Sequence, residues 1–360
     1  MDAQTSYFCA ALDAAAEQVK ENIPVFGKEF PLPCTRNGVY STDINTDWTP
    51  GFYTGMCWLA YEATGEDVFR TAALQQVDSF AARLVCNENL DHHDLGFLYT
   101  PSCVAGYQLT GSTAARNAAL EAAARLTKRY QPTGQFLQAW GQIHDRKEYR
   151  LIIDCLLNLP LLWWAAEQTG DPRYAEIARA HTATAAKVLF RPDGSTSHTC
   201  YMDPVTGKPV RAMTAQGYRA DSAWARGQAW GILGMALAYR FTHEPAYLEQ
   251  FRACASFFLK RLPANNVPYW DLIFTEGDEP RDSSAAAIAA CGLYEAKLNG
   301  QRAGDVILAP GITDYRRRVQ YQTYDITPLL RSGENVLTVQ LADGWYRGST
   351  GAWGLRNQYG

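Results

Sequence analysis

Apolar residues recur at helical spacing along most of the chain, and we expect ten helical segments. They lie around residues 5–20, 50–64, 67–86, 95–110, 113–129, 157–169, 173–190, 222–241, 245–261 and 281–293. Three of them end at Thr64-Gly65, Thr110-Gly111 and Thr169-Gly170. Glycine after the last turn readily adopts the left-handed conformation of a helix C-cap. Helical hairpins repeated in this way close into a solenoid or a toroid.

After residue 293 the pattern changes from helix to strand. Residues 294–302 contain two strand-like runs around Asn299-Gly300, a dipeptide typical of a β-hairpin turn. Residues 319–327 and 334–341 alternate with the period of a strand. This segment is short for a free-standing β-sandwich. We therefore predict a mainly α chain in which a helical domain at 1–292 is followed by a short antiparallel β segment at 293–360.

Composition excludes several classes of protein. Hydrophobic residues make up 47% of 360 residues, which is ample for a core, and the net charge of −4 with no basic run argues against nucleic-acid binding. No apolar run reaches transmembrane length, and residues 1–5 do not resemble a signal peptide. Nine scattered cysteines without a CxxC pair indicate free thiols, so we expect a cytoplasmic protein that binds no membrane.

Asp154 is the most informative residue, because it lies inside the apolar run 151–164. Desolvation raises the pKa of a carboxyl group, and a carboxyl group that stays protonated near neutral pH can act as a general acid. The alternative is that Asp154 only caps the helix that follows. Asn158 and Pro160 weaken that alternative, because they offer a second helix start. From this run alone, both interpretations stay open.

Three further clusters place acids or amides beside aromatic residues just before a helix. They are residues 45–51, 91–97 and 221–230. Most tryptophans pack in cores, but an indole beside Asp, His, Arg and Gln can also stack on a sugar ring while the polar groups bind its hydroxyls. His92-His93 is too small a cluster for a metal site without further ligands. We expect a sugar-binding cleft that needs no metal or cofactor.

The helical part resembles glycoside hydrolase family 88, the unsaturated glucuronyl hydrolases. The matching stretches include 46–55, 93–97, 153–160, 197–198, 216–218, 224–231 and 282–285. They span the whole of 1–292. The resemblance implies an (α/α)6 toroid, in which the chain has about ten of twelve helices, so the fold class is an incomplete toroid.

The same resemblance implies the site residues. Asp154 would be the general acid and base, and Asp94 its essential partner carboxylate. The implied substrate-binding residues are Trp48, His93, Trp140, His198, Gln216, Trp224, Arg226 and Trp230. From the residues alone, core packing remains an equal alternative for Trp224 and Gln216.

The tail resembles a different family. Residues 292–302, 315–325 and 343–348 are similar to the N-terminal β-sandwich of family 78 bacterial α-L-rhamnosidases. Only the first part of that sandwich is represented. We hypothesise that the chain is a chimera joined near Gly292, produced either by gene fusion or by an error in sequence assembly. Because the last helix pair of the toroid is missing, we expect its neighbouring helices to expose apolar faces.

The family 88 resemblance implies an unusual hydrolysis. Its substrate is an oligosaccharide with a 4,5-unsaturated uronic acid at the non-reducing end, left by a polysaccharide lyase, and the enzyme hydrates the vinyl ether of that sugar. Two alternatives remain: a protein related to α-L-rhamnosidases, supported by the tail, and an inactive sugar-binding remnant.

Overall fold

The computed structural model describes residues 3–143 and 145–293, and every predicted helical segment is helical there. The uninterrupted helices are α1 (Ala3–Phe26), α2 (Pro50–Thr64), α3 (Asp67–Cys86), α6 (Thr113–Thr127), α7 (Pro160–Thr169), α8 (Pro172–Val188), α9 (Ala225–Thr242), α10 (Pro245–Leu259) and α11 (Ser283–Leu293). The C-caps Gly65 and Gly170 have φ of 73° and 71°, which explains why these ends were predictable.

The predicted helix at 95–110 is interrupted. It consists of α4 (Leu95–Tyr99), a π-helical turn (Thr100–Val104) and α5 (Ala105–Thr110). Pro101 has no N–H to donate to the preceding turn, and a wider turn accommodates it. The apolar periodicity continues across this turn, so the sequence pattern alone did not show the break.

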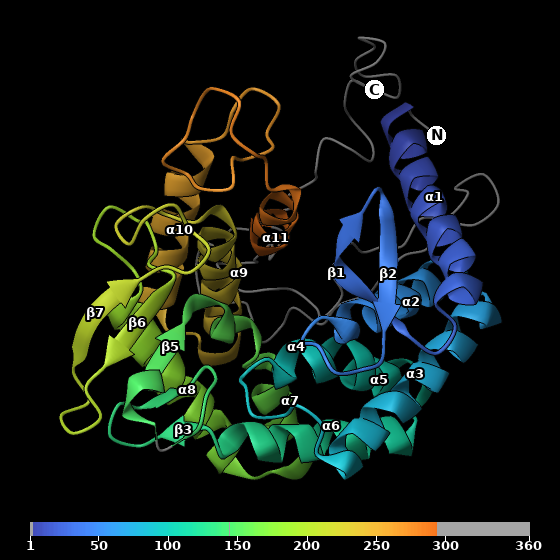
Figure 1. The fold of residues 1–360 in the computed structure, drawn as a ribbon, viewed down its shortest axis with the longest axis horizontal. Coiled ribbons are helices and arrows are strands. Elements are labelled where there is room, and N and C mark those ends of the chain that lie inside the picture. Colours follow the sequence, from blue (N-terminus) through green and yellow to red (C-terminus); the bar gives the residue numbers. More distant parts are fainter. Residues whose placement is uncertain (1–2, 144, 294–360) are drawn as a thin grey trace, which may run out of the picture.

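Successive helices pack as hairpins, α2 with α3, α7 with α8 and α9 with α10. The hairpins follow one another around an arc from α1 to α11 (Figure 1). Helix α9 is the most enclosed, with Gly234 pressed against Leu156 and buried residues on several faces. The predicted mainly α chain with an incomplete (α/α)6 toroid is confirmed.

Three small antiparallel sheets were not predicted. They pair β1 (Phe30–Arg36) with β2 (Val39–Asp43), β3 (Tyr130–Gln131) with β4 (Phe136–Leu137), and β5 (Arg150–Ile152) with β6 (Thr199–Met202) and β7 (Pro209–Met213). Most of these strands are too short to show a period of two in sequence. They lie in the segments between helices, where the polar clusters also lie.

Helix α11 belongs to the helical domain. Its Ala285 and Ala289 are buried, and a Cβ at Gly292 would lie 2.9 Å from the Leu233 backbone of α9. The β segment predicted after residue 293 lies outside the described residues. Within the described part of the chain, no helix is long and apolar enough to cross a membrane.

Helix α8 carries a buried histidine that makes stability depend on pH. His181 is fully buried, and its Nδ1 accepts a hydrogen bond from the Leu137 amide at 2.9 Å. Burial lowers the pKa of His181 to about 3. The unfolded chain takes up this proton near pH 6.5 and the folded chain only at much lower pH, so stability is lost as the pH falls below about 6.5.

We expect His181→Asn to remove this dependence, because an amide oxygen can accept the same hydrogen bond without titrating. In urea unfolding, the loss of stability between pH 7 and pH 5 should be smaller than in the parent by about 2 kcal/mol. His243→Asn is the matched control, since His243 is exposed. An unchanged pH dependence in His181→Asn would contradict this assignment.

Candidate active site

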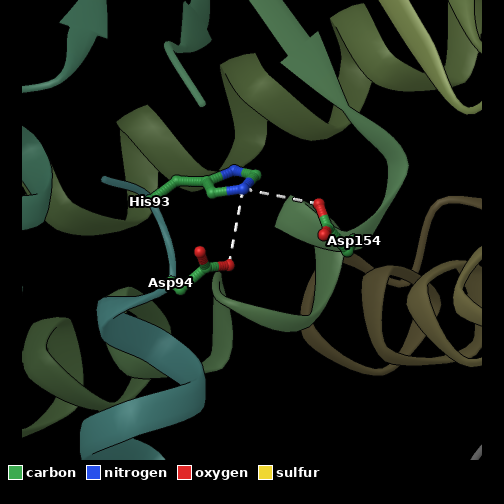
Figure 2. A group of neighbouring side chains, drawn as sticks. All are labelled: His93, Asp94 and Asp154. Atoms are coloured by element: carbon green, nitrogen blue, oxygen red, sulfur yellow. Dashed lines mark ion pairs between the residues drawn. The ribbon is translucent and has the colours of Figure 1, made fainter. Parts of the chain in front are cut away.

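Two carboxylates from different elements meet at one histidine. His93 Nε2 lies 3.4 Å from Asp94 Oδ1 and 3.5 Å from Asp154 Oδ1, as Figure 2 shows. Asp94 is the N-cap residue of α4, and Asp154 lies in the first turn of a 3₁₀ helix, Ile153–Leu157. The structure therefore brings Asp154 to the adjacent residues His93 and Asp94, although Asp94 and Asp154 lie 60 positions apart in the sequence.

Asp154 does not cap a helix. The cap position of its 3₁₀ helix is Ile152, and α7 begins at Pro160 after Leu159. The Asp154 Oδ1 atom is buried without a hydrogen-bond partner, although one-fifth of the side chain is exposed. A carboxyl group held in this way, open to the site and unsatisfied by the protein, is available to a substrate.

The pKa values of the two carboxyl groups are shifted in opposite directions. Burial, and next the negative charge of Asp94, raise the pKa of Asp154 well above its ordinary value. Burial acts on Asp94 in the same direction, but His93, His92 and Asn158 outweigh it and hold the pKa of Asp94 below its ordinary value. At any pH between the two shifted pKa values, the pair thus holds a protonated Asp154 beside an ionised Asp94.

The imidazole of His93, which contacts both carboxyl groups, is uncharged near neutral pH. Burial lowers its pKa to about 4, and its backbone amide donates to the Ala139 carbonyl at 2.7 Å. The ring packs edge-on against Trp140, with 6.1 Å between centroids. A neutral imidazole can donate or accept a hydrogen bond without adding a charge that would ionise Asp154.

The same three residues could in principle hold a cation, since their ligand atoms all lie within 4.8 Å of one another. A metal ligand must be deprotonated, and the burial that raises the pKa of Asp154 opposes this. The donor set therefore suits a shared proton better than a metal ion.

A second group of predicted residues contacts the first through the backbone. The Ile153 amide, next to Asp154, donates to the His198 carbonyl at 3.0 Å. The His198 ring lies 4.7 Å from that of Trp224, and the Arg226 guanidinium lies 5.3 Å from the same indole. Arg226 also pairs with Asp282 at 3.1 Å, a residue that lies in a stretch resembling family 88 but was not among the predicted site residues.

The other three predicted site tryptophans, Trp48, Trp140 and Trp230, lie in two places. Trp48 and Trp230 line one cavity of about 480 Å³ together with Arg226. Phe97 joins them, with its ring 5.8 Å from Trp48 and 5.2 Å from Trp230. Trp140 is 37% exposed beside His93.

Gln216 is the predicted residue that the structure does not bring into this network. It is exposed in the segment after β7, and no hydrogen bond links it to the other site residues among those described. Its flanking backbone does approach the site, since the Ala215 amide donates to His198 Nδ1 at 3.0 Å.

Asn158 is a positioning residue that the sequence marked only as a helix start. Its Oδ1 accepts a hydrogen bond from the Phe97 amide at 2.7 Å, which ties α4 to the 3₁₀ helix of Asp154. Gly96 allows this contact, because a Cβ there would lie 2.2 Å from the Asn158 Cα. The separation of the two carboxylates thus depends on the absence of a side chain at residue 96.

Gly96→Ala should separate the carboxylate pair. The clash is with backbone, so α4 and the 3₁₀ helix must move apart, and we expect a stability loss of about 3 kcal/mol together with a large fall in kcat. Gly106→Ala is the control, because its Cβ would meet the Trp58 ring at 3.0 Å, away from the carboxylates. Urea unfolding and kcat per folded molecule separate the two effects. Normal kcat in folded Gly96→Ala would contradict this role.

An arc of helical hairpins that holds a pair of carboxyl groups at a helix entrance is the architecture of a glycosidase of the α/α-toroid class. The chain belongs to Glycosyl Hydrolase Family 88, whose sequence model matches residues 26–307. It is 51% identical over 286 residues to the unsaturated chondroitin disaccharide hydrolase of Streptococcus pyogenes serotype M1, covering 79% of this chain and 72% of that protein.

Further relatives agree. The unsaturated glucuronyl hydrolase of Bacillus sp. strain GL1 is 47% identical over 278 residues, covering 76% of this chain and 73% of that protein. The crystal structure of unsaturated glucuronyl hydrolase from Streptococcus agalactiae matches with a TM-score of 0.78 at 48% identity, covering 79% of this chain and 72% of that chain. The predicted resemblance to family 88 is confirmed.

The tail resemblance is confirmed as well. The model of the alpha-L-rhamnosidase N-terminal domain matches residues 281–360. An alpha-L-rhamnosidase of Streptomyces avermitilis is 59% identical over 71 residues, which is 20% of this chain and 7% of that protein. The two family models overlap at residues 281–307, and the described part of this overlap includes α11, which packs on α9.

Proposed function

We propose that this chain removes a 4,5-unsaturated uronic acid from the non-reducing end of lyase-generated oligosaccharides by hydrating the vinyl ether. The observation that carries the proposal is the pair of Asp94 and Asp154, whose carboxyl groups both approach His93 Nε2, at 3.4 and 3.5 Å, in a chain that belongs to family 88. The names of its relatives support this substrate class.

Asp154 acts first as an acid. Its proton goes to C4 of the unsaturated sugar, and the electrons of the C4–C5 double bond form the new C–H bond. Positive charge develops at C5 and on the ring oxygen. The Asp154 carboxylate then accepts a proton from the water that attacks C5, and the product is a hemiketal that opens and releases the remaining sugar. One buried carboxyl group can perform both steps because its proton is returned within a turnover.

In this proposal the negative charge of Asp94 keeps Asp154 protonated before the reaction. In this proposal the substrate lies between Trp140 and the cavity lined by Trp48 and Trp230. His93, His198 and Arg226 bind its hydroxyl or carboxylate groups, and Trp224 packs beside them. Gln216 stays in the proposal as a residue that contacts the sugar beyond the bond that breaks.

The test is an assay on an unsaturated chondroitin disaccharide that follows the loss of absorbance of the conjugated double bond. We expect turnover that persists after dialysis against EDTA, because the proposed chemistry uses no metal. Absence of turnover with sulfated and unsulfated disaccharides alike would refute the function. Loss of activity in EDTA would instead point to a cation at His93, Asp94 and Asp154.

The rhamnosidase alternative has weaker support, since the tail matches only 7% of the length of the Streptomyces avermitilis rhamnosidase. A p-nitrophenyl rhamnoside assay tests it directly. We keep the boundary near residue 292 as the proposed division between a family 88 domain at 1–292 and a rhamnosidase-type β-sandwich fragment at 293–360. Sequencing genomic DNA across codons 285–300 tests whether the junction is a gene fusion.

We also propose that the protein works in the cytoplasm. Cys57, Cys103 and Cys254 are buried free thiols, as is typical of a reducing compartment. Fractionation of the producing cell tests this placement.

A further inference from the structure

Outside the proposed catalytic pair, the three-stranded sheet carries a row of alternating cations and aromatic rings. The Arg150 guanidinium lies 4.8 Å from the Trp140 ring and 5.2 Å from the Tyr201 ring. The Arg211 guanidinium lies 4.8 Å from the same Tyr201 ring. We call Arg150, Tyr201 and Arg211 the arginine ladder.

The strand register builds the ladder. Arg150 of β5 pairs with Tyr201 of β6, and Tyr201 pairs with Arg211 of β7. Residues opposite one another in antiparallel strands point to the same face of the sheet, so the three side chains form one row. Arg150 also donates a hydrogen bond to the Tyr201 hydroxyl, which fixes the order of the row.

The ladder begins at the proposed active site. Trp140, which Arg150 contacts, packs its ring 6.1 Å from that of His93, and His93 contacts both carboxylates. The row therefore runs from the catalytic pair through Trp140 to the outer strand β7. Neighbouring strands lie about 4.8 Å apart, so Arg211 lies on a strand about 10 Å from that of Arg150.

The two arginines differ in charge compensation. Arg150 Nη2 lies 2.6 Å from the Glu148 carboxylate, so its charge is paired inside the protein. Arg211 is exposed, and among the described residues no carboxylate lies within 4 Å of it. A guanidinium that lies over an aromatic ring can still offer its N–H groups to a bidentate anion.

We propose that Arg211 binds an acidic group, a carboxylate or a sulfate, on a sugar at least two residues beyond the unsaturated uronic acid. Arg150 and Tyr201 hold it in position. The inference rests on the proposed function and adds a specificity for the length and charge of the substrate. A disaccharide ends before the outer strand, whereas an acidic tetrasaccharide has a charged sugar that can reach it.

The experiment measures binding by calorimetry in the full chain carrying Asp154→Asn, so that substrate is not consumed. The ligands are an unsaturated chondroitin disaccharide, an unsulfated unsaturated chondroitin tetrasaccharide and its sulfated counterpart. Adding Arg211→Ala should weaken binding of an acidic tetrasaccharide about tenfold and leave the disaccharide unchanged. Added salt should weaken tetrasaccharide binding in the parent more than in Arg211→Ala.

The two tetrasaccharides identify the acidic group. An equal loss for both assigns the internal carboxylate, and a loss confined to the sulfated one assigns a sulfate. Arg211→Lys should recover part of the affinity, since it keeps the charge but not the planar edge. Arg179→Ala is the matched control, because Arg179 is also exposed and stacks on an indole, that of Trp163, on helix α8.

Equal binding of both tetrasaccharides with and without Arg211 would overturn the inference, as would an equal loss for the disaccharide. If the parent binds none of the three ligands, the proposed function itself fails and the inference fails with it. Retained disaccharide binding therefore tells the two failures apart.

Discussion

Asp154→Asn is expected to lower kcat by about 10⁴-fold while substrate affinity stays within a few-fold of the wild type. The figure is the upper end of what a general acid or base contributes, because one group is asked to perform both proton transfers. Asparagine keeps the shape of the side chain and cannot release a proton. The measurement is kcat from the absorbance of the conjugated double bond, with affinity from calorimetry.

The wild-type pH profile gives the same residue a second test. The active form of Asp154 is protonated, so kcat/KM should fall as the pH rises through its elevated pKa. Asp171→Asn is the control, since Asp171 caps α8 far from the site chemistry and accepts from the Arg173 amide at 3.0 Å. Near-normal kcat in Asp154→Asn would refute the assignment of Asp154 as the acid.

The helical framework was predictable from sequence because its signals are local. Gly65 ends a helix because glycine readily adopts the positive φ of a C-cap. Pro172 begins a helix because its fixed φ and missing N–H suit the first helical position. The π-turn at Pro101 was not predictable, because the apolar pattern that packs the helix continues through it. The short strands likewise depend on partners far away in the sequence.

The candidate site divides in the same way. Asp154 was identified from its apolar neighbours, since burial of a carboxyl group is a property of the local run. Its pairing with Asp94 came from the family resemblance, and the contact of Gly96 with Asn158 that sets their spacing appeared only in three dimensions. Gln216 was also predicted from the family resemblance, but its side chain makes no hydrogen bond to the other site residues among those described.

Asp94→Asn is expected to lower kcat/KM by about 10²- to 10³-fold and to change the pH profile. The ionised Asp94 raises the pKa of Asp154, so removing this charge stabilises the Asp154 carboxylate and lowers that pKa. At pH 7 a smaller fraction of the enzyme then holds the proton that the first step needs. The basic limb of the profile should move to lower pH.

Asp91→Asn provides the matched control in the same loop, because the Asp91 side chain is 94% exposed. It should leave both the rate and the profile unchanged. The double variant Asp94→Asn, Asp154→Asn should be no slower than Asp154→Asn alone, since Asp94 acts through the proton of Asp154. A profile of Asp94→Asn that keeps its basic limb in place would mean that Asp94 only supports the helix entrance. Fully additive losses in the double variant would mean that Asp94 stabilises the reacting sugar independently of Asp154.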